Sequence, residues 1–250
     1  MEYKYRLGEL YCGPGGIALA ARDACVTDSN GDRWSIIHAW ATDIDQDTCN
    51  TYSSNICSSD TETVYCEDGR QLDFKKLTNI DALAFGFPCN DFSIVGEHKG
   101  IDGSYGPLYT YGVEALNHFK PDWFLAENVG GLQSANGGDA LKTILTELAE
   151  SGPGYTITPH LYRFEHYDVP QARHRIIIIG FRNDLGFEFK VPAPTTRGRE
   201  ITCREAIEVP PIHEDAYNHE YTRQSEVVRR RLEHIKPGQN AFNSDLPDDL

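Results

Sequence analysis

One stretch in the first half of the chain decides the fold: residues 81–93, which read DALAFGFPCNDFS. The apolar run 82–85 predicts a buried strand that ends at Gly86. Pro88 then fixes the backbone beside Cys89. A cysteine that directly follows a central strand lies where α/β sheets bind their ligands. The stretch therefore predicts an α/β fold with a thiol at the ligand-binding edge of its sheet.

Strands and helices alternate on both sides of this stretch. Runs rich in apolar and β-branched residues predict strands at 5–11, 36–42, 62–66, 80–86, 122–126, 156–163 and 175–181. Helical spacing predicts helices at 15–23, 45–54, 106–119, 138–150, 203–208 and 224–235. This alternation indicates a mostly parallel sheet with helices on both faces. Because the run 175–181 is uniformly apolar, we expect it to form a central strand that is buried on both faces.

Composition excludes several classes of protein. With 40% apolar and 24% charged residues, the chain is globular and not disordered. It has no apolar run of about 18 residues that could cross a membrane, and its N-terminus lacks the apolar core of a signal peptide. The seven cysteines include no Cys-x-x-Cys pair, so neither a disulfide framework nor a zinc ribbon fits them. We therefore expect a cytoplasmic protein without a metal, in which most cysteines are small core residues.

The charge of the chain is unevenly distributed. The net charge is −15, which argues against extensive contact with nucleic acid, because phosphates are neutralised by Lys and Arg. Residues 1–150 carry −13, residues 151–200 carry +2 and residues 201–250 carry −4. The basic stretch surrounds residues 171–175, QARHR. Any polyanion is therefore expected to meet a small local patch, or to bind with the help of another chain.

A glycine-rich turn follows the first predicted strand. Residues 11–16, YCGPGG, join this strand to a helix, and such a turn lets a ligand approach the backbone and the helix N–H groups. Pro14 removes an N–H donor that a pyrophosphate would need, which disfavours an NAD-dependent oxidoreductase. A nucleoside cofactor without phosphates fits the turn better. A tight turn that binds no ligand is the alternative.

Acidic residues follow the next two predicted strands. Asp43, followed by Ile44, is placed to accept hydrogen bonds from both hydroxyls of a ribose. Asp68, followed by Gly69, is placed to accept from an exocyclic amine. The ends of parallel strands meet at one edge of a sheet, so these acids together suit an adenosine with a positive or neutral tail. Solvated acids at strand ends are the alternative.

Three further residues could act with Cys89. Only a thiolate is nucleophilic, and a free thiol has a pKa of about 8.5, so a nearby cation or helix N-terminus is needed. Glu127 follows an apolar strand, so burial should raise its pKa, and a proton-sharing carboxyl suits addition of sulfur to a conjugated ring. Arg173 and Arg175 alternate, so their guanidinium groups should point the same way. A solvated Glu127, or a structural ion pair of Arg175 with Glu127 or Asp168, is the alternative.

Together these segments resemble the DNA (cytosine-5) methyltransferases. The resemblance covers about residues 5–185, with the motifs in the order of the family. Residues 11–16 are similar to the Phe-x-Gly-x-Gly-Gly loop of that family, with Tyr11 in place of Phe. The resemblance implies a Rossmann-like methyltransferase fold and S-adenosylmethionine as the cofactor. It assigns cofactor binding to Tyr11, Gly13, Gly15, Gly16, Asp43, Ile44, Asp68, Gly69, Phe87 and Leu108.

The catalytic motifs match as well. Residues 86–89, GFPC, resemble the catalytic loop, and residues 127–129, ENV, resemble its Glu-Asn-Val partner. Residues 171–175 match the Gln-x-Arg-x-Arg element, and residues 106–108 match the segment beside the methionine part of the cofactor. The resemblance assigns catalysis to Cys89, Glu127, Asn128, Arg173 and Arg175.

The resemblance implies a reaction on cytosine in double-stranded DNA, as in a bacterial restriction-modification system. The base is flipped out, Cys89 adds to carbon 6 and carbon 5 takes the methyl group. Glu127 bonds ring nitrogen 3 and the exocyclic amine, Arg175 holds the carbonyl at position 2, and Arg173 faces a phosphate. A tRNA cytosine-5 methyltransferase and a non-catalytic cofactor-binding or regulatory subunit are the alternatives.

Two features depart from the pattern of the family. Asn90 stands where Gln is usual after the cysteine. The target-recognition region and the last two motifs are not found, so we expect a catalytic and cofactor-binding domain over 1–185 and an extension over 186–250 that leads toward that region. A split enzyme and a truncated form of a longer chain would look the same. We expect that a second polypeptide with the recognition region is needed for full activity.

Overall fold

The computed structural model describes residues 1–57, 61–87, 108–220, 222–247 and 250. The strands are β1 (Glu2–Leu10), β2 (Cys25–Thr27), β3 (Arg33–Asp43), β4 (Val64–Cys66), β5 (Ala82–Gly86), β6 (Trp123–Val129), β7 (Tyr155–Arg163) and β8 (His174–Arg182). The helices are α1 (Gly16–Asp23), α2 (Gln46–Ile56), α3 (Tyr109–Phe119), α4 (Asp139–Glu150), α5 (Cys203–Glu208) and α6 (Glu226–His234). In these ranges no helix has the length and apolar character that a membrane span requires.

The order of the strands places a ligand crevice at β1. The sheet runs β2-β3-β1-β5-β6-β8-β7, and β4 pairs with the end of β3. The pairs among β1, β3, β4, β5 and β6 are parallel, whereas β2, β8 and β7 pair antiparallel with their neighbours. The chain passes from β1 to β3 on one side and later returns to β5 on the other, so the strand order reverses at β1, where α/β sheets bind their ligands. The predicted mostly parallel sheet is confirmed.

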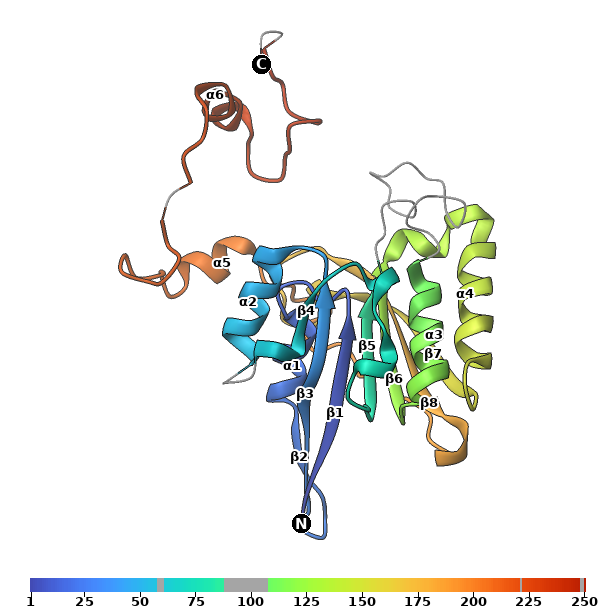
Figure 1. Ribbon diagram of the computed structural model, residues 1–250. Coiled ribbons are helices and arrows are strands. Elements are labelled where there is room, and N and C mark those ends of the chain that lie inside the picture. The colour runs from blue at the N-terminus through green and yellow to red at the C-terminus, as the bar shows by residue number, and fades with distance from the viewer. Residues whose placement is uncertain (58–60, 88–107, 221, 248–249) are drawn as a thin grey trace. The chain divides into compact units, whose positions relative to one another are not determined.

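Helices cover both faces of this sheet (Figure 1). Helices α3 and α4 pack on one face, where their buried side chains meet those of β5, β6 and β8. The apolar residues of α4 recur at the spacing of one helix face, with Ala140, Ile144 and Leu148 all fully buried. On the other face, Ala18 of α1 and Tyr52 of α2 pack with Ala41 of β3. The sheet that carries the predicted site residues at one edge is therefore packed against helices on both faces.

Strand β8 differs from its prediction. It pairs with β6 and β7, but it is next to the edge of the sheet and not central. Ile176 and Ile178 are 1% exposed, whereas Ile177 and Ile179 are only partly buried. The prediction of a central strand buried on both faces was wrong, because α3 and α4 pack only on the side of Ile176 and Ile178. Strand β2, which pairs with the start of β3, was not predicted.

The chain divides into two compact units, Met1–Ile201 and Thr202–Leu250. The segment after β8 belongs to the first unit because it is tied back to the turn after β7. The N–H groups of Thr195 and Thr196 both donate to the His166 carbonyl oxygen at 3.0 Å. The first unit therefore extends beyond residue 185, where we expected the catalytic domain to end. A functional division between residues 185 and 186 stays a prediction.

The second unit contains the two helices predicted from sequence. Helix α5 begins with a capping box, in which Thr202 accepts from the Glu205 N–H and the Glu205 carboxylate accepts from the Thr202 N–H. Helix α6 begins at Ser225, whose side chain accepts from the Val228 N–H. Helix α5 begins at residue 203 as predicted, whereas α6 begins at Glu226, two residues later than predicted, directly after its cap Ser225.

Candidate active site

The turn after β1 is fixed to the end of β3. Tyr11 and Gly13 both have a φ of 56°, and Gly15, which precedes α1, has a φ of 97°. Such left-handed conformations favour glycine, so this turn needs its glycines. The Gly13 N–H donates to Asp43 Oδ2 at 3.0 Å. The conformation of the turn and the orientation of the Asp43 carboxylate are therefore determined together.

A cavity of about 150 Å³ lies between this turn and the ends of β3 and β4. Six of the ten predicted cofactor residues line it, together with three others: Tyr11, Thr42, Asp43, Ile44, Glu67, Asp68, Gly69, Arg70 and Leu108. Tyr11 closes one side, because its hydroxyl donates to the Leu108 carbonyl oxygen at 3.0 Å. The Tyr11 ring lies against Gly69, where a Cβ atom would come within 3.0 Å of it. Residues almost a hundred positions apart thus form one cavity.

Asp43 and Ile44 present two different surfaces to this cavity. Besides the Gly13 N–H on Oδ2, the Asp45 N–H donates to Asp43 Oδ1 at 3.1 Å. Each carboxylate oxygen keeps a second lone pair, so Asp43 can still accept hydrogen bonds from ligand hydroxyls. The Ile44 side chain is 71% exposed and offers an apolar contact for a planar ring. The pair suits a sugar joined to an aromatic base.

Asp68 is engaged by an arginine that the sequence did not single out. Arg70 Nε lies 2.9 Å from both carboxylate oxygens of Asp68. Hydrogen bonding by Arg70 holds the pKa of Asp68 below its usual value, so this acid is ionised. An exocyclic amine in the cavity would therefore share Asp68 with Arg70.

The other predicted cofactor residues do not line the cavity. Gly13, Gly15 and Gly16 form the turn and the start of α1. Phe87 is 2% exposed, and its ring packs near Phe85 in the core. The Phe87 carbonyl oxygen accepts from Asn128 Nδ2, and contact of Phe87 with a cofactor stays a prediction.

Glu127 and Arg175 meet on neighbouring strands. In the antiparallel register of β6 and β8, Val129 lies opposite Arg175, and Arg175 Nε is 2.7 Å from Glu127 Oε1. Burial raises the pKa of Glu127, although the charges of Arg175 and Arg173 act to lower it. The raised pKa predicted for Glu127 is confirmed. The ion pair with Arg175 that the sequence left as an alternative is also present.

Arg173 lies just before β8 and is exposed. Its charge lowers the pKa of Glu127, as that of Arg175 does, so both arginines act on the same carboxyl. Arg175 also donates from Nη1 to the His174 carbonyl oxygen at 2.8 Å. Arg175 is thus held in place, whereas the Arg173 side chain extends toward solvent.

Asn128 holds the backbone that leads into the predicted catalytic loop. It is 1% exposed, and its Nδ2 donates to the Phe87 carbonyl oxygen at 3.3 Å. Gly86 lies so close to Glu127 that a Cβ atom there would be 3.3 Å from Oε2. Glu127 therefore lies beside Gly86, the last residue of β5. Gly86 precedes Cys89 by three residues in the sequence. Cys89 itself lies outside the described residues, as do Asn90 and positions 106–107.

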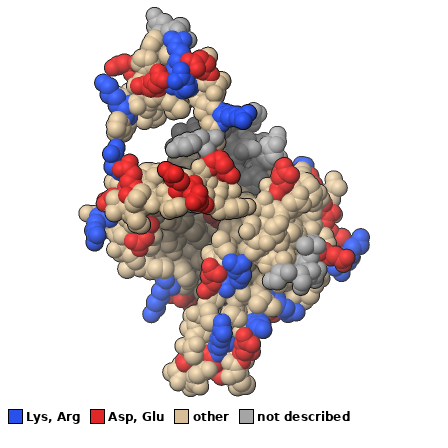
Figure 2. Space-filling model, turned by 90° about the vertical axis from the view of Figure 1, so that its left-hand side faces the viewer, with Lys and Arg blue, Asp and Glu red and all other residues tan. Residues whose placement is uncertain are grey.

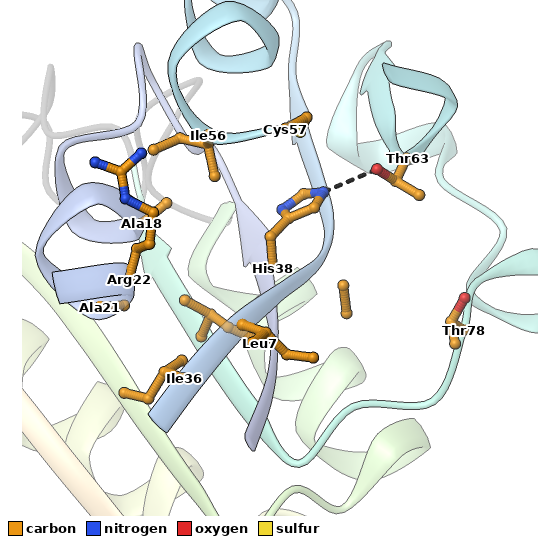
Figure 3. Close-up of a pocket in the computed structure, with 12 residues that line it drawn as sticks. Leu7, Ala18, Ala21, Arg22, Ile36, His38, Ile56, Cys57, Thr63 and Thr78 are labelled. Carbon is orange, nitrogen blue, oxygen red and sulfur yellow. Dashed lines mark hydrogen bonds between the residues drawn. The ribbon is translucent and has the colours of Figure 1, made fainter. Parts of the chain in front are cut away.

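A buried chain of hydrogen bonds lies beneath the glycine turn. Glu9 is 1% exposed and accepts from the Tyr52 hydroxyl. His38 Nδ1 is 3.1 Å from that hydroxyl, and His38 Nε2 is 2.9 Å from Thr63 Oγ1 (Figure 3). The Tyr52 ring supports the turn, since a Cβ atom at Gly15 would be 3.1 Å from it. The sequence did not predict these hydrogen bonds, although Glu9, an acidic residue inside an apolar strand, was a signal for them.

A larger hollow lies apart from the predicted site residues. It has a volume of about 460 Å³ on the side of the sheet covered by α1 and α2, and its lining includes Leu7, Ile36 and His38 (Figure 3). No predicted site residue lines it. Among the described residues, no group of three His, Cys, Asp or Glu side chains could hold a metal ion. Six of the ten predicted cofactor residues therefore line the smaller of these two cavities.

Comparison with known proteins identifies relatives over nearly the whole chain. The family of C-5 cytosine-specific DNA methylases matches residues 5–247. The Type II methyltransferase M.BbvI of Brevibacillus brevis is 52% identical over 99% of this chain, which spans 67% of that protein. The Type II methyltransferase M.NgoFVII of Neisseria gonorrhoeae is 33% identical over 98% of this chain, which spans 63% of it. Both relatives are thus longer than this chain.

Solved structures share the fold. A protein described as a DNA modification methyltransferase from an Escherichia coli prophage has a TM-score of 0.65 and 23% identity, covering 88% of this chain and 58% of its own. A Spodoptera frugiperda DNMT2 mutant has a TM-score of 0.61 and 21% identity, covering 93% of this chain and 66% of its own. At this identity the likeness shows the fold alone.

The buried Glu9 predicts how stability depends on pH. Burial raises the pKa of Glu9 from 4.5 to about 7, so the folded protein favours the protonated form. Stability should therefore fall as the pH rises from about 4.5 to about 7, by about 3 kcal/mol in total. Glu9→Gln cannot ionise but keeps an oxygen that can accept from the Tyr52 hydroxyl. The stability of this variant should therefore not fall over this pH range. Urea unfolding at pH 5 and pH 8 measures the difference.

The exposed Glu188→Gln serves as the control and should follow the wild-type pH dependence. If Glu9→Gln and the wild type lose stability in parallel between these pH values, Glu9 does not titrate as its burial implies.

Proposed function

The chain belongs to the family of C-5 cytosine-specific DNA methylases, and from this premise we propose that it methylates carbon 5 of cytosine in duplex DNA. The methyl donor is S-adenosylmethionine, and the setting is a bacterial restriction-modification system. The match over residues 5–247 carries this proposal. The names of the two Type II methyltransferase relatives support the setting.

The cavity beside the glycine turn fits the adenosine part of the cofactor. Asp43 would accept from the ribose hydroxyls, Ile44 would contact the adenine, and Asp68 would accept from the exocyclic amine. These three residues are acidic or apolar, and Arg70, the cation in the lining, is paired with Asp68. This lining suits a nucleoside with a positively charged tail. When bound, S-adenosylmethionine supplies an electrophilic methyl group to carbon 5 of the base.

Glu127 and Arg175 would bind the target cytosine. The raised pKa of Glu127 favours a carboxyl that can share its proton with ring nitrogen 3 and accept from the exocyclic amine. Arg175 uses Nε for Glu127 and Nη1 for the His174 carbonyl, so its Nη2 can donate to the carbonyl at position 2. Both contacts withdraw electrons from the ring and stabilise charge that develops during addition.

Cys89 would act as the nucleophile on a flipped base. Its thiolate forms a bond to carbon 6, the electrons of the 5,6 double bond move toward carbon 5 and the ring, and carbon 5 takes the methyl group. Loss of the proton from carbon 5 then restores the double bond and expels the thiolate. Asn128 positions this loop through the Phe87 carbonyl. Arg173, exposed beside the pair, is left for a phosphate.

Full activity would also need a recognition region, on a second polypeptide or in a longer chain. Base flipping costs a few kcal/mol of unstacking, which recognition contacts normally offset. This chain has a net charge of −15, so its own phosphate contacts are few. This chain spans 67% and 63% of the lengths of the two relatives. The rest of each relative is long enough to include such a region.

The nucleophile can be tested by substitution and by trapping. Cys89→Ala should abolish methyl transfer and leave S-adenosylmethionine affinity nearly unchanged, because the thiol contacts the base and not the cofactor. In the complete enzyme, DNA with 5-fluorocytosine should form a covalent adduct on Cys89, since fluorine cannot leave as a proton does. Mass spectrometry of the digested adduct locates it. Cys66→Ala, an exposed cysteine, is the matched control. An adduct on another cysteine would refute the assignment.

The two acids should have separable effects. Asp43→Ala removes a charged acceptor from the ribose, a contact worth about 1.5–3 kcal/mol, so cofactor affinity should fall by about tenfold or more. Glu127→Gln should slow turnover with little change in cofactor affinity. Calorimetry with S-adenosylmethionine and single-turnover methylation separate the two. If Glu127→Gln weakens cofactor binding and Asp43→Ala slows only methyl transfer, the roles assigned to the two acids are reversed.

Residues 1–250 alone should methylate duplex DNA poorly. Adding a polypeptide with the recognition region, or supplying that region in one longer chain, should raise the rate. Incorporation of labelled methyl groups into duplex DNA measures both. Sequence-specific methylation at full rate by residues 1–250 would place the recognition function within 186–250.

A further inference from the structure

Four arginines of the first unit make no side-chain hydrogen bond or ion pair in the part of the chain that the structure describes: Arg163, Arg173, Arg197 and Arg199. The other six arginines of residues 1–201 are bonded: Arg6, Arg22, Arg33, Arg70, Arg175 and Arg182. With 38 acidic and 23 basic residues in the chain, an arginine readily finds an acidic partner. Arg173 acts on Glu127 through its charge, whereas Arg163, Arg197 and Arg199 have no acidic partner among the described residues, which points to a negatively charged ligand.

Two of these arginines line one hollow beside the edge strand β7. The hollow has a volume of about 320 Å³, and its lining is His160, Leu161, Arg163, His166, Tyr167, Pro194 and Arg197. Its two walls are held together by the hydrogen bonds from the Thr195 and Thr196 N–H groups to the His166 carbonyl, both 3.0 Å. Arg163 and Arg197 thus approach one space from segments more than thirty residues apart.

Each acid near this hollow has a partner other than the two arginines, although Glu165 Oε2 is buried without a hydrogen-bond partner among the described residues. Glu165 Oε1 is 2.8 Å from His174 Nε2, and Asp168 Oδ2 accepts from the Thr195 hydroxyl at 2.8 Å. Glu200 lies 3.6 Å from His166 Nε2. None of these contacts involves Arg163 or Arg197, so within the described part of the chain both guanidinium groups keep their N–H donors for a ligand.

The hollow lies at the same edge of the sheet as the catalytic residues. Across β6, β8 and β7, Val129 lies opposite Arg175, and His174 lies opposite Arg163. Two strand spacings, on the order of 10 Å, therefore separate the end of β6 from the end of β7. On the side of the first unit that carries α1 and α2, by contrast, basic and acidic side chains are interspersed over the described surface (Figure 2).

We propose that the hollow formed by Arg163 and Arg197 binds a phosphate of the DNA backbone and so positions the duplex beside Glu127 and Arg175. The planar fork of a guanidinium group matches two phosphate oxygens, and two forks in one hollow can hold one phosphate from two directions. Contacts to phosphates fix the register of a protein on DNA without reading its sequence. This site rests on the proposed function, since it names where that substrate is held.

The test compares two double variants in the complete enzyme with a fluorescent duplex that contains the target cytosine. Arg163→Gln with Arg197→Gln should weaken DNA binding by about tenfold and reduce the slope of log affinity against log salt by about 1. Affinity for S-adenosylmethionine and the single-turnover rate at saturating DNA should stay at wild-type values. Arg163→Lys with Arg197→Lys keeps the charges and should restore the slope.

The matched control is Lys4→Gln with Arg33→Gln, which removes two exposed charges at the opposite end of the strands and should leave affinity and slope unchanged. An unchanged affinity and slope in the Arg163 and Arg197 double variant would overturn the proposal, as would a loss of binding to tRNA but not to duplex DNA. DNA binding is read without turnover. A wild type that binds duplex DNA without methylating it would therefore contradict the proposed function alone.

Discussion

The hydrogen bond from the Gly13 N–H to the Asp43 carboxylate is the contact on which the cofactor side of the site depends. It joins the turn after β1 to the end of β3, and a bond to a charged group contributes about 1.5–3 kcal/mol. Tyr52 supports the same turn from below, where its ring meets Gly15 and its hydroxyl donates to Glu9. The turn is thus held from two sides, which leaves the lone pairs of Asp43 oriented toward the cavity.

Much of the fold and site was predictable because its signals are local. The strand before Cys89 and the helix at 138–150 follow from residue type and spacing, and the topology of a parallel sheet then brings Asp43 and Asp68 to one edge. What could not be predicted depends on partners distant in sequence. Nothing near Glu9 indicates Tyr52, 43 residues away. An apolar run such as 175–181 shows that a strand is buried, but not which strands or helices flank it.

The ion pair of Glu127 and Arg175 shows why a structural and a catalytic role need not exclude each other. Burial of Glu127 raises its pKa, and the pair with Arg175 keeps the buried carboxyl compensated while no base is present. In the proposed reaction, a cytosine that enters the site would offer a ring nitrogen and an amine to Glu127 and a carbonyl to Arg175. The base would then meet two side chains that are already oriented, and the strength of their ion pair would set how readily they bind it.

The net charge of −15 and a DNA substrate are compatible because electrostatic interactions are short-ranged in salt. At physiological ionic strength the screening length is about 8 Å, so acids on α1, α2 and the remote parts of the sheet act weakly on a phosphate at the β7 edge. An arginine in contact with that phosphate is not screened in this way. What decides the binding is therefore which guanidinium groups lack an internal partner. In the first unit those described arginines lie in residues 163–199, around the strand end that carries Arg175. Under this proposal, acids elsewhere on the first unit repel only a phosphate that comes within a screening length of them, which disfavours DNA binding at those surfaces and not at the β7 edge.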